Sequence, residues 1–146
     1  MKYKHILYPS DGSSHSLKAL EHVKIIAKEF SSQITILVVY QQPFSIVNNY
    51  NALPMNLWEQ YKQENKVSAE KIAKEALSIL VTFGISNVDF KVVEGNQKLL
   101  ICEYANKLGV DLIIMGSRGH TSGNYIGSTS TYVINNTPGI PVLVVG

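Results

Sequence analysis

Two short stretches of the sequence hold residue types that can bind a ligand. The first is Ser10-Asp11-Gly12-Ser13, which sets one of the three aspartates of the chain among small and hydroxyl residues. A carboxylate at such a place can accept hydrogen bonds from a ribose hydroxyl or from a helix N-terminus, or hold a metal through water. An equally open alternative is that Asp11 only stabilises the turn.

The second stretch runs from Gly116 to Ser130 and contains four glycines, several hydroxyl side chains and Arg118, the single arginine. Glycine lets backbone N–H groups approach an anion closely, and a helix that follows presents its positive N-terminal end. The planar guanidinium of Arg118 can donate two hydrogen bonds to the oxygens of a phosphate. A Gly/Ser-rich stretch by itself is more often a flexible polar loop. Its place between an apolar run and a helix start favours an anion site.

Five apolar runs alternate with helical patterns and predict the elements that position these residues. The runs are apolar at nearly every position, which is typical of strands covered on both faces in parallel sheets. The predicted strands are Ile6–Tyr8, Ile34–Tyr40, Val88–Val93, Asp111–Met115 and Pro141–Val145.

Helical stripes of apolar residues lie between these runs. One begins after Ser13 or Ser14, either of which can serve as its N-cap. Two others end at Gly84 and Gly109, because glycine is the usual residue just past a helix. The spacing predicts a last, shorter helix over 128–136, before Pro138.

The alternation of strands and helices predicts one α/β domain over residues 1–146, with a parallel sheet and right-handed crossovers. Ligands of such sheets bind at the carboxyl ends of the strands, where both stretches fall. The segment from Gln41 to Asn56 is long, Asn-rich and holds two prolines. It is either a functional cover of that edge or a surface excursion with no role.

Composition and missing motifs exclude several classes of protein. The chain is 45% hydrophobic, which argues against disorder, and no apolar run nears the ~20 residues of a membrane span. A net charge of +2 with dispersed lysines does not indicate nucleic acid as a partner. The first ten residues lack a secretory signal pattern, and the lone Cys102 fits a reducing compartment, so we expect a cytoplasmic protein.

The motifs of several enzymes and metal sites are also missing. There is no P-loop, no dinucleotide fingerprint after the first strand, no hydrolase elbow and no metal-ligand spacing of His and Cys. Neither a catalytic residue nor a metal ligand is therefore predicted.

Four segments together resemble the universal stress protein family: MKYKHILYPSDGS, ILVVY, VDLIIMGSRG and GSTSTYVINNTPGIPVLVVG. The resemblance spans nearly the whole chain and is closest to the ATP-binding branch. The signature of that branch is Gly, two residues, Gly, nine residues, then Gly-Ser or Gly-Thr. Gly116, Gly119 and Gly127-Ser128 match it, with seven residues in the place of nine.

The resemblance implies a fold, a ligand and a partner. The fold is a Rossmann-like domain with a five-stranded parallel sheet of order 3-2-1-4-5 and helices on both faces. The ligand is ATP, or ADP or AMP in the shortened loop, with Mg²⁺ as a possible companion, and the partner is a second copy paired through strand Val142–Val145. The implied nucleotide-binding residues are Pro9, Ser10, Asp11, Val39, Met115, Gly116, Arg118, Gly119, Gly127, Ser128, Thr129 and Ser130.

Three functions are compatible with the sequence. The first is a regulatory, stress-response protein that binds an adenine nucleotide and hydrolyses it slowly at most, because no general base is evident. The second is a dimeric interaction module without a nucleotide. The third, an adenylating enzyme, is disfavoured because the Ser10–Ser14 turn only loosely resembles a pyrophosphatase loop and the chain has no second substrate domain.

Overall fold

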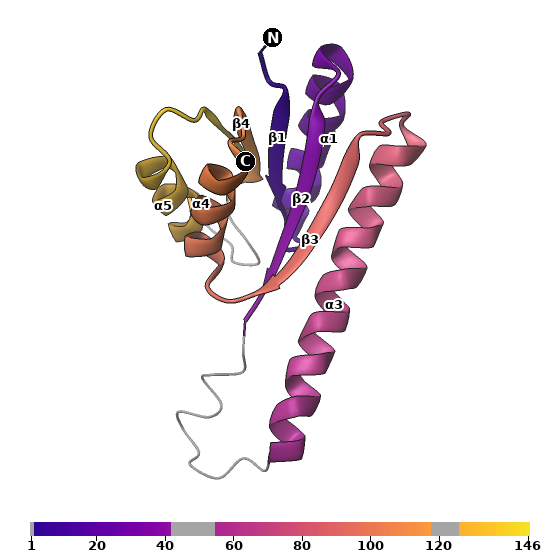
Figure 1. Ribbon diagram of the computed structural model, residues 1–146, viewed down its shortest axis with the longest axis vertical. Helices are drawn as coiled ribbons and strands as arrows, with labels where there is room; N and C mark the ends of the chain where they lie inside the picture. The colour runs from indigo at the N-terminus through magenta and orange to yellow at the C-terminus, as the bar shows by residue number, and fades with distance from the viewer. Residues whose placement is uncertain (1, 42–54, 118–125) are drawn as a thin grey trace.

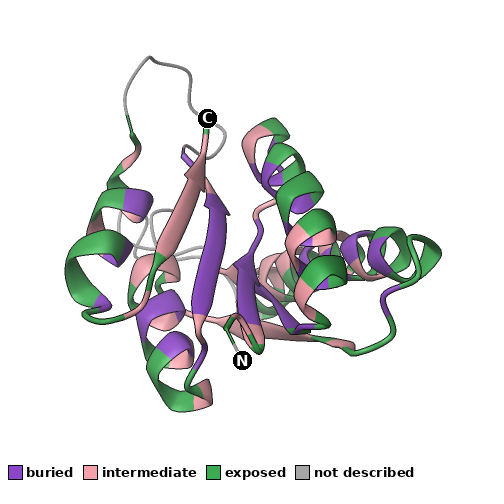
Figure 2. Cartoon of the chain, turned by 90° about the horizontal axis from the view of Figure 1, so that it is seen from above, coloured by how far each residue is buried: buried purple, intermediate pink, exposed green. Residues whose placement is uncertain are grey.

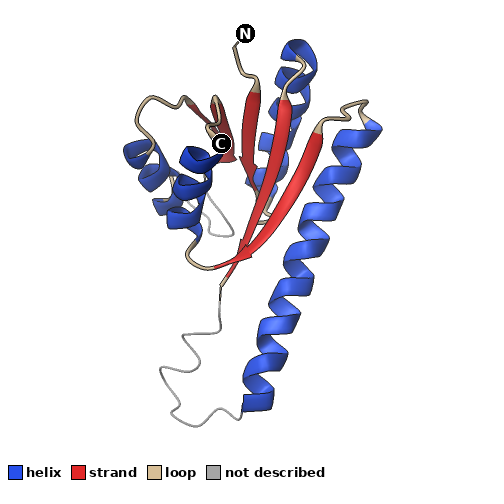
Figure 3. Ribbon diagram, viewed as in Figure 1, coloured by secondary structure: helices blue, strands red, loops and turns tan. Residues whose placement is uncertain are grey.

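The strands form one parallel sheet in the order β3-β2-β1-β4-β5, as predicted (Figure 1). The computed structural model describes residues 2–41, 55–117 and 126–146. The strands and helices along the chain, distinguished by colour in Figure 3, are β1 (His5–Pro9), α1 (Ser14–Phe30), β2 (Gln33–Tyr40), α3 (Met55–Thr82), β3 (Val88–Glu94), α4 (Gln97–Leu108), β4 (Leu112–Gly116), α5 (Ser128–Asn136) and β5 (Val142–Val145).

Helices cover both faces of the sheet, which explains why the strands are apolar at nearly every position. On one face α1 and α3 pack against alternate strand residues such as Ile6, Tyr8 and Ile36. On the other face α4 and α5 pack against Leu7, Leu37 and others. Figure 2 shows the result, with buried central strands and helices that are exposed on their outer sides.

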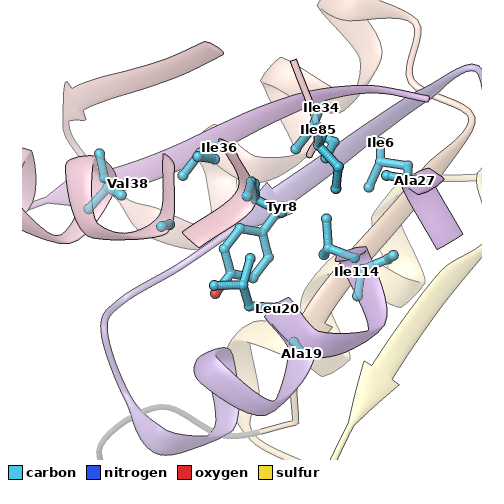
Figure 4. Packing of buried hydrophobic residues seen from close by; sticks show 14 of the residues in the cluster. Ile6, Tyr8, Ala19, Leu20, Ala27, Ile34, Ile36, Val38, Ile85 and Ile114 are labelled. Atoms are coloured by element: carbon cyan, nitrogen blue, oxygen red, sulfur yellow. The ribbon is translucent and has the colours of Figure 1, made fainter. Parts of the chain in front are cut away.

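Tyr8 is a polar exception within the α1–α3 face. Figure 4 shows its ring among apolar side chains, with the hydroxyl directed at α1. The hydroxyl donates a hydrogen bond to Ser16 O at 2.6 Å, so the buried oxygen is satisfied. Burial raises the pKa of Tyr8 to about 12, and the side chain therefore stays protonated at physiological pH.

The predicted helix ends are confirmed where the structure describes them. Ser13 caps α1 by accepting a hydrogen bond from Ser16 N at 3.2 Å. Gly109, with φ 61°, is the C-cap of α4, and Gly84, with φ 99°, follows α3. These positive φ values explain why glycine follows both helices.

The helix α3 is longer than its apolar stripe indicated. The apolar stripe that is predicted to end at Gly84 begins at Ala69 and packs on the sheet, but the helix itself begins at Met55. Met55 and Asn56 therefore do not belong to the expected loop. Residues 42–54 of that loop lie outside the described part of the chain. The first turns of α3 are rich in polar residues that form helices well but contribute little to a core stripe. Figure 1 shows α3 reaching well past the end of β3.

In the described ranges 2–41, 55–117 and 126–146, no helix has both the length and the apolar character needed to cross a bilayer.

Candidate nucleotide site

The carboxyl ends of β1 and β4 lie side by side, although the two strands are far apart in the sequence. The chain leaves β1 for α1 on one face of the sheet and leaves β4 for α5 on the other face. The connections therefore diverge at this point, which is the topological switch point of the sheet. Ligands of open α/β sheets bind outside the strand ends at such a point. The two stretches selected from the sequence are the turns that border it.

The strands of the sheet do not all end at the same level beside this point. Pro9, the last residue of β1, pairs with Leu37, whereas β2 continues to Tyr40 and pairs there with Glu94 of β3. Three further residues of strand extend about 10 Å. On one side of this point, β2 and β3 therefore project past the end of β1.

The turn after β1 is held by its own hydrogen bonds. Ser10 N donates to Leu37 O at 3.0 Å, and Asp11 Oδ1 accepts from Ser13 N at 2.9 Å. The second contact is an Asx turn, which orients the carboxylate at the start of α1. An ionised carboxylate accepts several hydrogen bonds at once, so Asp11 can stabilise the turn and still bind a ligand.

Gly12 completes the turn with a φ of 76°. A Cβ built on it would lie 3.0 Å from Ile72 Cδ1, so α3 packs directly against the turn.

Gly116 ends β4 at a point where α1 crosses closely. A Cβ on Gly116 would lie 2.8 Å from the carbonyl carbon of His15 and 2.9 Å from Ser16 N. Both are backbone atoms, which cannot turn aside. Glycine is therefore required here by the packing of α1 on β4, whatever ligand binds nearby.

The glycine-rich stretch is closed at its base. Gly127 N donates to Ser117 O at 2.7 Å, and Ser117 N donates to Val145 O at 2.7 Å. Arg118 and Gly119, two of the predicted phosphate contacts, lie outside the described residues.

Ser130 is placed differently from its predicted role as a phosphate ligand. Its side chain is buried, and its hydroxyl lies 2.9 Å from Gly116 O and 3.1 Å from Ser117 O, to which it donates. The hydroxyl proton is therefore used in hydrogen bonds to the main chain at the end of β4. The sequence pattern could not separate this role from ligand binding, because both require a small hydroxyl residue.

The N-terminus of α5 differs from those of α1 and α4. Ser13 and Asn96 cap α1 and α4 with their side-chain oxygens. Gly127 occupies the cap position of α5, and among the described residues no side chain caps this helix. The first four N–H groups of a helix have no partner within the helix. The start of α5 therefore presents donors and the positive end of the helix dipole.

The first turns of α1, α4 and α5, all within the described part of the chain, contain no acidic residue. All three helices begin at the carboxyl edge, because each follows a strand of a parallel sheet. Acidic side chains are the usual residues that compensate the positive end of a helix. Asp11 nevertheless lies at the start of α1 and Glu94 ends β3 just before α4, so the positive end of α5 is the one suited to an anion.

The remaining predicted residues lie at the ends of the strands or in the first turn of α5. Pro9 and Met115 are buried, and Val39 is half-buried near the end of β2. Val39 and Met115 lie on the α4–α5 face. Ser128 is exposed and Thr129 is half-buried in the first turn of α5. The structure thus brings apolar strand ends, a carboxylate and a helix N-terminus to one edge, an arrangement suited to a base, a ribose and a phosphate.

Sequence reasoning did not select Lys98, which follows the cap of α4. Its Nζ lies 5.3 Å from the centre of the Tyr132 ring of α5. The sequence did hold a signal for it. Lys98 comes two residues after Asn96, which lies between a predicted strand and the next helical pattern.

Comparison with known proteins links the chain to one family. The model of the universal stress protein family matches residues 2–146. Universal stress protein MJ0531 of Methanocaldococcus jannaschii is 35% identical over 98% of this chain and 82% of its own length.

Solved structures share the fold over the whole chain. The universal stress protein UspA from Lactobacillus plantarum superposes with a TM-score of 0.84 at 23% identity, covering 100% of this chain and 99% of its own. The universal stress protein from Archaeoglobus fulgidus in complex with dAMP gives a TM-score of 0.69 at 18% identity, covering 100% of both chains.

Proposed function

Because the chain belongs to the universal stress protein family, we propose that it is a regulatory protein that binds an adenine nucleotide between the ends of β1 and β4. The proposed ligand is ATP, with ADP and AMP as alternatives. The N-terminus of α5, which no described side chain caps, begins at the same edge of the sheet as Asp11, and this observation carries the proposal. The dAMP complex of a protein with the same fold supports it.

Each part of the nucleotide has a matching part of the edge. The apolar side chains of Pro9, Val39 and Met115 at the strand ends suit the flat base, and the Asp11 carboxylate suits the ribose hydroxyls. The phosphates would be held by backbone N–H groups and hydroxyls at the start of α5. The proposed ligand contacts are Pro9, Ser10, Asp11, Val39, Met115, Gly116, Gly127, Ser128, Thr129 and the main chain of Ser130, together with Arg118 and Gly119 from outside the described residues.

The proposal includes little or no catalysis. Mg²⁺ is usually bound through one or two carboxylates together with substrate phosphates, and Asp11 is a carboxylate at this edge. Phosphoryl transfer also needs a positioned nucleophile and stabilisation of the transferred group. The described turns supply hydrogen-bond donors for binding, and we assign no general base among them.

We also propose that two copies pair through β5 in the cytoplasm. The residues of β5 are half-buried and apolar, and the strand lies at the edge of the sheet. Edge strands offer unpaired N–H and C=O groups to a partner. This same strand favours the second candidate function, a dimeric interaction module that needs no nucleotide.

Titration calorimetry with ATP, ADP and AMP, each with Mg²⁺, tests the proposal. GTP serves as a control for the base, and light scattering records the oligomeric state in the same samples. We expect saturable binding of at least one adenine nucleotide and weaker binding of GTP. A dimer that binds no adenine nucleotide at millimolar concentration would instead establish the interaction module.

A further inference from the structure

Lys98 stands at an unusual position in α4. It lies on the stripe that continues with the buried Ile101, Cys102 and Ala105, at spacings of three, four and seven residues. Periodicity predicts an apolar residue at its position, but the structure has a half-buried lysine there.

The charge of Lys98 also conflicts with its place in the helix. It is the second residue of α4, and the N-terminus of a helix carries the equivalent of about half a positive charge. A cation there is unfavourable unless an anion lies nearby. Lys107 gives the contrast, because it is a cation in the last turn of the same helix, where the dipole favours it.

The contact with Tyr132 directs Lys98 toward the start of α5. The side chains of a helix tilt toward its N-terminus, so the Tyr132 ring lies over the turn that precedes it, which is the first turn of α5. The Lys98 ammonium, 5.3 Å from the centre of that ring, is held beside the same turn. Both α4 and α5 begin at the carboxyl edge of the sheet, and the two helices pack against each other.

We propose that Lys98 binds the phosphate chain of the nucleotide and makes the site prefer di- and triphosphates over adenosine and AMP. Tyr132 is the positioning residue that holds the ammonium there. This inference rests on the proposed function, because the anion it serves is the phosphate end of that nucleotide. The bound anion would also relieve the conflict between the Lys98 charge and the dipole of α4.

The chain offers a matched control for this proposal. The Lys107 ammonium lies 5.5 Å from the centre of the Tyr104 ring, a contact of the same kind at the other end of α4. Lys98→Gln and Lys107→Gln each remove one positive charge and one contact between a lysine ammonium and a tyrosine ring. Only the first variant changes the edge of the sheet that holds the proposed site.

The test measures affinities for adenosine, AMP, ADP and ATP in the wild type and both variants. We expect Lys98→Gln to weaken ATP and ADP about fivefold, the effect of one partly exposed charge interaction. Adenosine binding should stay unchanged, and Lys107→Gln should bind every ligand like the wild type. Lys98→Arg, which keeps the charge and stacks on an aromatic ring, should retain the preference for ATP.

A second pair of variants separates positioning from fold stability. Tyr132→Phe keeps the ring under the ammonium, so it should keep the ATP preference, whereas Tyr132→Leu should lose part of it. The proposal is overturned if Lys98→Gln weakens adenosine and ATP equally, or if it leaves ATP affinity unchanged. A wild-type protein that binds no adenine nucleotide would instead overturn the proposed function, and the role of Lys98 with it.

Discussion

A negative charge placed in the first turn of α5 gives the sharpest test of the nucleotide site. Ser128 is the first residue of this helix and is exposed, so it can be changed without disturbing the core. In Ser128→Asp a carboxylate takes the place that we assign to a phosphate. Ser128→Asn is the matched control, because it has nearly the same shape and no charge.

The expected loss of affinity follows from Coulomb's law. A carboxylate about 5 Å from one phosphate charge opposes it by about 1–3 kcal/mol for effective dielectric constants between bulk water and a protein surface. This corresponds to a loss of about five- to hundredfold in ATP affinity. The same carboxylate should stabilise the fold, because an acidic residue in the first turn of a helix adds about 0.3–1 kcal/mol to the free energy of unfolding.

Calorimetric titration and thermal unfolding of the same samples separate the two effects. We expect Ser128→Asp to melt slightly higher than the wild type and to bind ATP about five- to hundredfold more weakly, while adenosine binding is unchanged. Ser128→Asn should bind ATP within about twofold of the wild type, as expected for a surface change. An aspartate variant that binds ATP like the asparagine variant would refute a phosphate site at the start of α5.

Three further predictions concern the sheet edge, the packing at the site and the response to pH. Pro141 O accepts a hydrogen bond from Ile113 of β4, and Val145 O accepts one from Ser117 just after it, so the backbone groups of Val144 point away from β4. Val144→Pro should therefore abolish a dimer through β5 in light scattering while the chain stays folded. Gly116→Ala places a Cβ against the backbone of α1 and should lower the free energy of unfolding in urea by about 1–3 kcal/mol, and an unchanged value would contradict the close approach. Burial lowers the pKa of His5 below 6.5 and outweighs the charges of Asp89 and Asp111, which raise it. Just below pH 6.5 the unfolded chain therefore binds a proton at His5 that the folded chain does not. The His5 contribution to stability should therefore fall as the pH drops below 6.5, and His5→Gln should lose less stability than the wild type between pH 7.5 and 5 in urea titrations.

The fold could be predicted because local signals agreed with each other along the chain. Uninterrupted apolar runs such as the one ending at Tyr40 require cover on both faces, and helices between parallel strands supply it. The confirmed helix ends, such as Ser13 and Gly109, rest on hydrogen bonds within a few residues of the chain. The start of α3 was missed because residues 59–66 are mostly polar and carry no apolar stripe back to Pro54, the residue directly before the helix.

The site could be predicted less completely, because its contacts join residues distant in the sequence. The pairing of Lys98 with Tyr132 depends on how α4 packs against α5, which no local pattern encodes. The closeness of Gly116 to His15 depends likewise on where α1 crosses β4.

A small residue near a ligand edge has two possible reasons to be there, and the structure separates them. Gly116 and Ser130 stand in the predicted site, yet close backbone packing requires the first and strand carbonyls occupy the hydroxyl of the second. A loss of binding at either position would therefore report a damaged fold as readily as a missing contact. Ser128 is exposed, and the Lys98 charge opposes the dipole of its own helix, so neither charge nor hydroxyl at these positions is required by the core. Changes at these two positions can separate the nucleotide-binding protein from the nucleotide-independent module, because they alter the charge that a phosphate would meet and leave the packing in place.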